Sequence, residues 1–238
     1  MTRGLAVSSE AALRGVWAER LGVAADAFDR PGPTFVERSD LAAVVVVRLG
    51  ATTAVAAPER ALRGLRSLAP AQLVDVGALL GAVEALRPNL LGAASLSFGD
   101  AQSIVPCLTR SARPGTEAEV ETVLSGCSVA EREESGLSQM AMRWIVSNRH
   151  GDPGGAAGYE VWNGALAHVG AAVDAESRGQ GLGLSAASAA VLHAIGAGLV
   201  PQWRCRRGNV TSARLSERLG FVTLGDQVTI DLVALETV

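Results

Sequence analysis

Apolar residues recur along this chain at two spacings, and segments of the two kinds follow one another in mixed order. Leu13, Val16, Trp17 and Leu21 have the three- and four-residue spacing of a helix over residues 8–21. Short runs rich in Val and Ala, bounded by Gly, Pro or Asn, predict strands. Further helices are predicted at residues 58–67, 70–86, 117–125, 182–198 and 211–219, with an acidic turn or helix at residues 129–136. Strands are predicted at residues 42–49, 52–56, 90–98, 140–147, 158–162, 166–173 and 200–205, with closing strands after residue 219. This order of elements predicts an α/β protein.

Polar and glycine-rich stretches between these elements predict turns and a linker. Residues 152–155 read Asp-Pro-Gly-Gly and residues 163–164 read Asn-Gly, so both are expected to be hairpin turns between the middle strands. The polar segment at residues 111–116 predicts a linker. Thr116 and Glu119 have the spacing of a capping box, which marks the start of the helix that follows.

A chain of 238 residues, of which 48% are hydrophobic, is long enough for two small domains with substantial cores. The predicted linker divides it into an N-terminal α/β module at residues 1–112 and a second domain at residues 113–238. The N-terminal half contains no catalytic signature. Its expected role is either to complete a pocket of the second domain or to mediate formation of a homodimer.

Charge and cysteine content exclude several classes of protein. The formal net charge of -3 provides no broad cationic surface, so neither nucleic acid nor a membrane is expected as a partner. No long apolar span resembles a signal peptide or a membrane helix, which makes a cytoplasmic location the default expectation. Cys107, Cys127 and Cys205 are far apart in the sequence, which favours buried free thiols over a disulfide framework or a metal site.

The segment with the clearest chemistry is residues 177–183, which read Ser-Arg-Gly-Gln-Gly-Leu-Gly between a predicted strand and a predicted helix. Glycines at alternate positions allow positive φ angles and let backbone N–H groups approach phosphate oxygens at the positive end of the helix. Arg178 would add a charge-assisted contact to the same anion. The pattern predicts a cradle for a pyrophosphate, although short glycine-rich turns also connect strands to helices without binding a ligand.

A second segment, residues 209–221, makes the interpretation more specific. Taken together, R-G-Q-G-L-G and N-x-x-S-x-x-L-x-x-x-L-G-F resemble the GNAT acyltransferase superfamily, and the resemblance covers roughly residues 117–238. It implies a mixed, splayed central sheet flanked by helices. It also implies an N-acetyltransferase that uses acetyl-CoA and no metal, with direct attack by a small-molecule or peptide amine.

The resemblance also implies which residues bind acetyl-CoA. Ala171, Ala172 and Val173 would line the gap beside the splayed strand, although they equally suit an ordinary buried strand. Asn209 and Ser212 would contact the pantetheine, and Asn209 also suits a helix N-cap. The pyrophosphate would be held by the loop residues Arg178, Gly179, Gln180, Gly181, Leu182 and Gly183. Arg204, Arg206 and Arg207 are open to two interpretations, as contacts to the 3'-phosphate or as solvated surface residues.

An alkyl amine is protonated at neutral pH, so the reaction needs a base. The candidates are Glu160, His168 and Glu134, each of which also has an ordinary structural interpretation as a solvated glutamate or a packed histidine. Many members of the superfamily have a Tyr that protonates the departing thiolate, and this chain has Ser216 at the matching position. Two alternatives to an enzyme therefore stay open: a non-catalytic acyl-CoA-binding or regulatory module, and a structural protein whose glycine-rich turn binds nothing.

Overall fold

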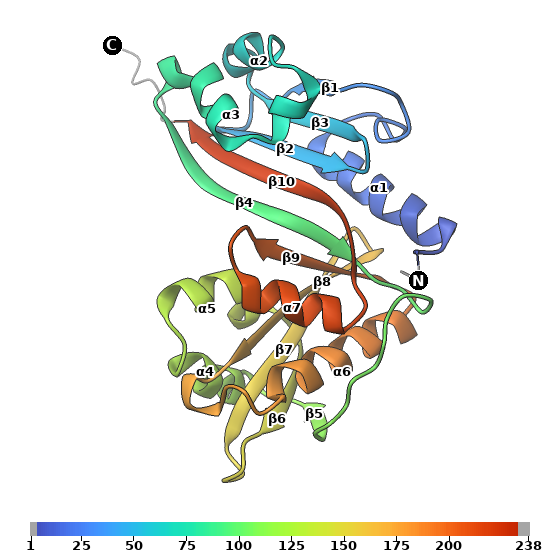
Figure 1. Ribbon diagram of the computed structural model, residues 1–238, viewed down its shortest axis with the longest axis vertical. Coiled ribbons are helices and arrows are strands. Elements are labelled where there is room, and N and C mark those ends of the chain that lie inside the picture. Colours follow the sequence, from blue (N-terminus) through green and yellow to red (C-terminus); the bar gives the residue numbers. More distant parts are fainter. Residues whose placement is uncertain (1–3, 233–238) are drawn as a thin grey trace. The chain divides into compact units, whose positions relative to one another are not determined.

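The computed structural model describes residues 4–232, which form two compact units (Figure 1). Each unit is assembled from separate stretches of chain. Unit 1 contains residues 4–9, Ser97–Arg204 and Asn209–Val222, and unit 2 contains Glu10–Leu96, Cys205–Gly208 and residues 223–232. The division into domains at residues 1–112 and 113–238 stays a prediction, and its outer ends at residues 1–3 and 233–238 lie outside the described residues.

Unit 2 is built on five strands in the order β1-β3-β2-β10-β4. The predicted hairpin is confirmed, because β2 and β3 pair antiparallel from Leu49↔Thr52 onwards. β1 pairs parallel with β3, and β10 pairs antiparallel with β2. The core of the unit joins valines of β2, β3 and β10 to leucines of the helices. The elements are α1 (Val7–Leu21), β1 (Thr34–Glu37), β2 (Ala43–Leu49), β3 (Thr52–Ala57), α2 (Glu59–Leu65), α3 (Val76–Ala82), β4 (Pro88–Phe98) and β10 (Val222–Leu232).

Two features of unit 2 differ from the sequence prediction. The helix predicted at residues 70–86 is wrong, because the chain forms a 3-10 turn at Pro70–Val74, α3, and a second 3-10 turn at Glu84–Leu86. Asp75 causes the first break: its backbone is extended, and its carboxylate accepts a hydrogen bond from the Ala78 amide at 2.7 Å, which starts a new helix. Strand β1 was not predicted, and it is stabilised by parallel pairing with β3.

Unit 1 contains a mixed sheet in the order β9-β8-β7-β6-β5. β8 pairs parallel with β9, whereas the β8–β7, β7–β6 and β6–β5 pairs are antiparallel. The mixed α/β sheet predicted for the C-terminal half is therefore confirmed. The strands are β5 (Ala112–Pro114), β6 (Met142–Ser147), β7 (Pro153–Trp162), β8 (Leu166–Val173) and β9 (Val200–Arg206).

The predicted turns of unit 1 are partly wrong. Residues 111–116 are not only a linker, because Ala112–Pro114 pairs with β6 as strand β5. Residues 153–155 belong to β7, and the turn lies earlier, where the Asn148 amide donates to the Asp152 carbonyl at 2.8 Å. The Asn163-Gly164 turn is confirmed, and both residues have the positive φ that this hairpin requires.

Helices cover both faces of this sheet (Figure 1). The helices of unit 1 are α4 (Glu117–Ser125), α5 (Val129–Ser135), α6 (Leu182–Gly196) and α7 (Val210–Arg218). α4 packs with Ile145, Ala156 and Ala172, which share one face. α6 lies against the opposite face, where a Cβ on Gly155 would meet Leu182. None of the helices within residues 4–232 is long and apolar enough to cross a membrane.

Candidate active site

The sheet of unit 1 opens between β8 and β9. The two strands pair from Leu166↔Val200 to Val169↔Trp203, and the pairing stops there although both strands continue. On its other edge β8 stays paired with β7 as far as Val173↔Gly155. Beyond Val169, therefore, one edge of β8 has no strand partner among the residues that the structure describes, which is the splayed geometry that the resemblance implies.

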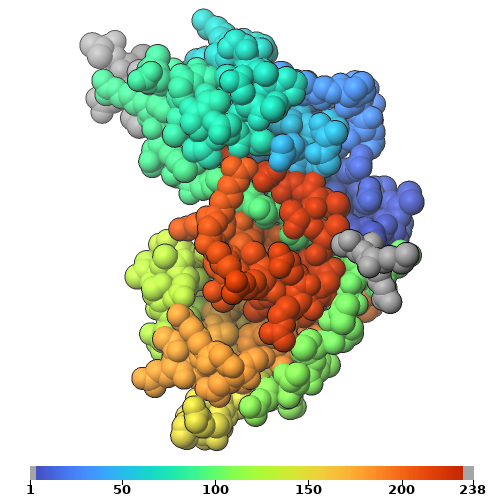
Figure 2. Space-filling view, in the orientation of Figure 1, coloured from blue at the N-terminus to red at the C-terminus, as the bar shows by residue number. Residues whose placement is uncertain are grey.

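A cavity of about 490 Å³ lies at this opening. Its walls come from β8, the loop before α6, the start of α6, α5, β9 and α7. Figure 2 shows α5, the loop before α6 and α7 on one face of unit 1, where they border a recess. Of the residues predicted to bind acetyl-CoA, those that line the cavity are Ala171, Ala172, Val173, Arg178, Gly179, Gly181, Leu182, Gly183, Asn209 and Ser212. Gln180 does not line it.

The glycine loop has the backbone geometry of an anion cradle. Gly179 and Gly181 have φ values of 75° and 78°, which side chains other than glycine adopt at a cost. Gly183 lies so close to β8 that a Cβ there would be 2.7 Å from a methyl group of Val173. α6 begins at Leu182 without a side-chain cap, so amides of its first turn are available to a ligand. The loop therefore fits the diphosphate of a CoA thioester.

Arg178 is held at the cavity by an ion pair with Glu131. Its Nη2 atom is 2.9 Å from one carboxylate oxygen of Glu131, and the two side chains are 49% and 45% exposed. Glu131 also closes a capping box on α5, accepting hydrogen bonds from the Ser128 amide and hydroxyl at 2.9 and 2.8 Å. The bonds from Ser128, and then Arg178, lower the pKa of Glu131. Burial raises the pKa of the neighbouring Cys127 thiol, and the charge of Glu131 raises it further.

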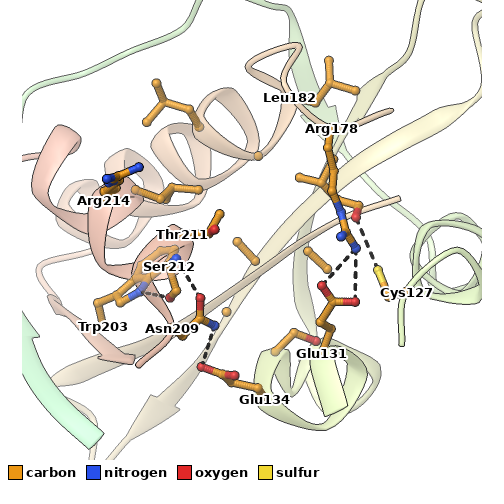
Figure 3. A pocket seen from close by; sticks show the side chains of 18 of the residues that line it. Cys127, Glu131, Glu134, Arg178, Leu182, Trp203, Asn209, Thr211, Ser212 and Arg214 are labelled. Carbon is orange, nitrogen blue, oxygen red and sulfur yellow. Dashed lines mark hydrogen bonds and ion pairs between the residues drawn. The ribbon is translucent and has the colours of Figure 1, made fainter. Parts of the chain in front are cut away.

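On the other side of the cavity Asn209 connects α7 to α5 (Figure 3). Its side-chain oxygen accepts from the Ser212 amide at 3.0 Å, so the predicted N-cap role is confirmed. Its Nδ2 atom donates to Glu134 at 3.1 Å. The Trp203 indole donates to the Ser212 hydroxyl at 2.9 Å, which fixes β9 against α7 and leaves the Ser212 proton to donate.

The three predicted base candidates lie in two places. Glu134 lines the cavity, whereas Glu160 and His168 do not. Glu160 and His168 lie directly opposite each other on β7 and β8. Glu160 accepts from the Trp162 indole at 3.0 Å, and His168 is 3.3 Å from the Gln202 amide nitrogen. The catalytic roles of all three stay predictions.

Ser216 does not replace the missing Tyr. Its side chain is buried, and its hydroxyl donates to the Ala213 carbonyl of the same helix at 2.8 Å. Tyr159 does not line the cavity either. Its hydroxyl lies 2.8 Å from His193 Nδ1, and its ring stacks with Trp144. Burial raises the pKa of Tyr159. The described lining of the cavity contains no Tyr.

Several residues that line the cavity were not predicted from the sequence. Only some of them follow a sequence pattern that could have identified them. Thr211, Leu215 and Arg218 follow Asn209 at the spacing of one helix face, so the α7 wall could have been extended from the motif. Cys127 and Glu131 come from a distant segment that carries no local signal for this site. Within residues 4–232 no group of three or more His, Cys, Asp or Glu side chains could hold a metal ion.

Part of the sequence that forms the site matches a known protein family. Residues 156–227 match the GNAT acetyltransferase family, a stretch that includes β8, the glycine loop and α7. No curated protein sequence matches the chain.

Solved structures with related folds share little sequence identity with this chain. A GCN5-related N-acetyltransferase from Kribbella flavida is 15% identical with a TM-score of 0.47, and the match covers 67% of this chain and 64% of that one. A GNAT-family acetyltransferase from Colwellia psychrerythraea is 13% identical with a TM-score of 0.47, over 60% and 57% of the two chains. A Drosophila protein is 16% identical with a TM-score of 0.50, over 68% and 58%. In each of the three, the match spans less than two thirds of the other chain. The family match at residues 156–227 lies in the C-terminal half of this chain and contains both motifs that resemble the GNAT superfamily.

Proposed function

We propose that this protein is an N-acetyltransferase that transfers the acetyl group of acetyl-CoA to an amine. The observation that carries the proposal is the position of the cavity. It joins the free edge of β8 to the glycine loop, so one extended ligand can contact both. A CoA thioester has this extended form, with a diphosphate at one end and a reactive acyl group at the other.

In this proposal the loop and β8 have separate tasks. Arg178 and the first amides of α6 bind the diphosphate through charge and hydrogen bonds. Beyond Val169 the free edge of β8 offers main-chain groups at Ala171 and Val173. Acetyl-CoA supplies an activated thioester when bound. A β8 amide that faces its carbonyl oxygen would stabilise the negative charge that develops there as the amine attacks.

Glu134 is the base candidate that the cavity favours. An amine with an ordinary pKa near 10 must lose a proton before or during attack, so a carboxylate inside the cavity is useful. Glu134 lines the cavity and accepts a hydrogen bond from Asn209, which holds its side chain toward α7. Its carboxylate would accept the amine proton directly or through one water. Glu160 and His168 would act only through a longer relay.

A second candidate function is supported by Ser216. Because this buried serine bonds its own helix, the protein lacks the tyrosine acid of many family members. A non-catalytic acyl-CoA-binding or regulatory module would need no such acid. An enzyme can also do without it, since a thiol with a pKa near 8.5 is a tolerable leaving group.

Release of free CoA thiol from acetyl-CoA, measured across a panel of small amines and peptides, separates the two functions. We expect amine-dependent release with at least one acceptor class. Binding of acetyl-CoA without release across the panel would support the second candidate instead. Absence of binding would contradict both.

A further inference from the structure

Helix α7 presents two arginines to the cavity. Arg214 and Arg218 are one helical turn apart on the face that also carries Thr211 and Leu215, and all four residues line the cavity. Figure 3 shows Arg214 on α7 and Arg178 on the loop before α6, which are separate elements of the cavity wall. The cavity therefore has arginines on both of these elements, and a further one, Arg204, on β9.

The arginines of α7 and of the loop differ in their partners. Arg178 is paired with Glu131. Neither Arg214 nor Arg218 has a carboxylate partner among the residues that the structure describes. Like charges four residues apart on a helix repel each other, so this pair is unfavourable in the absence of an anion. An anion bound between them would offset the repulsion.

Lack of a partner is not enough to mark a binding site. Arg60 and Arg63 on α2 are also exposed and have no carboxylate partner among the described residues. They lie on a helix of unit 2 and line no part of this cavity. What distinguishes Arg214 and Arg218 is that they share a cavity with the glycine loop.

A ligand that matches this wall carries a diphosphate and a second, separate anionic group. CoA has both, since its ribose bears a 3'-phosphate in addition to the diphosphate. We infer that Arg214 and Arg218 bind this 3'-phosphate, so that the cavity selects CoA over dephospho-CoA; the inference rests on the proposed function. A phosphomonoester carries a charge of about -1.5 to -2 at pH 7, and guanidinium groups match its oxygens with paired hydrogen bonds.

The other arginines considered for the 3'-phosphate are less suitable. Arg207 donates to Asp226 at 3.1 Å and to the Val74 carbonyl at 3.1 Å, both within unit 2. Arg206 does not line the cavity, whereas Arg204 does. Arg204 lies on β9. The single substitution Arg204→Gln therefore tests whether the preference for CoA over dephospho-CoA comes from the α7 arginines alone.

The test is isothermal titration calorimetry of CoA and dephospho-CoA with the full chain. The variants are the double substitution Arg214→Gln/Arg218→Gln, each single substitution, and Arg204→Gln. The matched control is Arg60→Gln/Arg63→Gln, which removes the same charge from a helix outside the cavity. Unfolding temperatures of all variants, measured alongside, show whether any loss of affinity comes from loss of folding.

We expect the unmodified protein to bind CoA at least about tenfold more tightly than dephospho-CoA, the equivalent of one strong charge-assisted contact. The α7 double variant should bind CoA only as tightly as dephospho-CoA, and the α2 control should keep the preference. Equal affinity of the unmodified protein for the two nucleotides overturns the 3'-phosphate site alone. A preference that survives in the α7 double variant also overturns it. Binding of neither nucleotide overturns the proposed function together with the site.

Discussion

Arg178 and Glu131 form an ion pair across the wall of the cavity, with Arg178 Nη2 at 2.9 and 3.1 Å from the two carboxylate oxygens. The guanidinium proposed to bind a diphosphate thus already has an anionic partner within the protein. A ligand must compete with this carboxylate, and the competition can be measured.

Replacing Glu131 by Gln should tighten acetyl-CoA binding. The amide oxygen of Gln can still accept from the Ser128 amide, so α5 keeps its cap, whereas Arg178 loses its competing carboxylate. Because exposed ion pairs contribute little, we expect affinity to rise only about two- to fivefold. Glu119→Gln is the matched control, since Glu119 has the same capping-box position on α4 and pairs with Arg113 outside the cavity. Weaker binding in the Glu131 variant would contradict the competition.

Acid should destabilise the protein partly through Glu119. Its hydrogen bond from Arg113, followed by those from Thr116, lowers its pKa from 4.5 to about 2. A carboxylate whose pKa is lower in the folded state stabilises the fold above its unfolded pKa, and this contribution is lost as the pH falls from 4.5 toward 2. Urea unfolding over this range should show a shallower pH dependence for Glu119→Gln. Glu133→Gln is the control, because Glu133 makes no ion pair among the described residues. Equal slopes for Glu119→Gln and the unmodified protein would disprove the contribution.

Gly170→Ala should destabilise unit 1. A Cβ at Gly170 would lie 1.9 Å from the Ser135 carbonyl oxygen, and this backbone atom at the end of α5 cannot rotate away. Overpacking of this kind costs about 1–3 kcal/mol. Gly196→Ala at the end of α6 is the comparison, because nothing lies within 4 Å of its added Cβ and alanine favours a helix. If both variants unfold at the same urea concentration, α5 does not pack on β8 as closely as described.

Substitution of the three base candidates should separate them kinetically. Glu134→Gln should lower kcat by about 10²- to 10⁴-fold, the usual contribution of a general base, while its amide oxygen still accepts from Asn209. Glu160→Gln and His168→Gln should have smaller effects, because neither side chain lines the cavity. The kcat of each variant at saturating acetyl-CoA and amine is the direct measurement. A loss of this size in Glu160→Gln or His168→Gln instead would assign the role of base to that residue.

Ser216→Ala should leave turnover unchanged to within about twofold, because a hydroxyl bonded to its own helix transfers no proton to a ligand. Single-turnover release of CoA thiol is the direct measurement. A large decrease would show that Ser216 takes part in the reaction after all.

Local signals in the sequence were sufficient to predict the elements that are determined by residues of their own segment. The bounds of β8, Leu166–Val173, agree with prediction because small and branched residues end at a polar turn. The capping box of Thr116 and Glu119 forms, with Thr116 donating and accepting as its spacing predicts. Asn163-Gly164 also turns as expected, since few other pairs tolerate positive φ twice.

The predictions of secondary structure were wrong where pairing with a strand distant in sequence overrides the local preference for a turn or a linker. Pro153 and the two glycines after it read as a turn, yet pairing with β6 and β8 makes them the start of β7. Residues 112–114 read as a linker, and only the neighbouring β6 turns them into a strand. The same limit applies to the site. Its motif residues were identified because they are consecutive in sequence, whereas Arg178 and Glu131 are separated by 47 residues and meet only in the fold.

Calorimetric titration of acetyl-CoA into the unmodified protein, Arg178→Glu and Arg113→Glu is the sharpest test of binding at the glycine loop. Arg113 is the matched control, because it pairs with the capping-box glutamate of α4 as Arg178 does with that of α5, and it lies outside the cavity. We expect binding to the unmodified protein and to Arg113→Glu, and none to Arg178→Glu with its folding intact. Undiminished binding to Arg178→Glu, or no heat with the unmodified protein, would show that the glycine loop does not bind the diphosphate of acetyl-CoA.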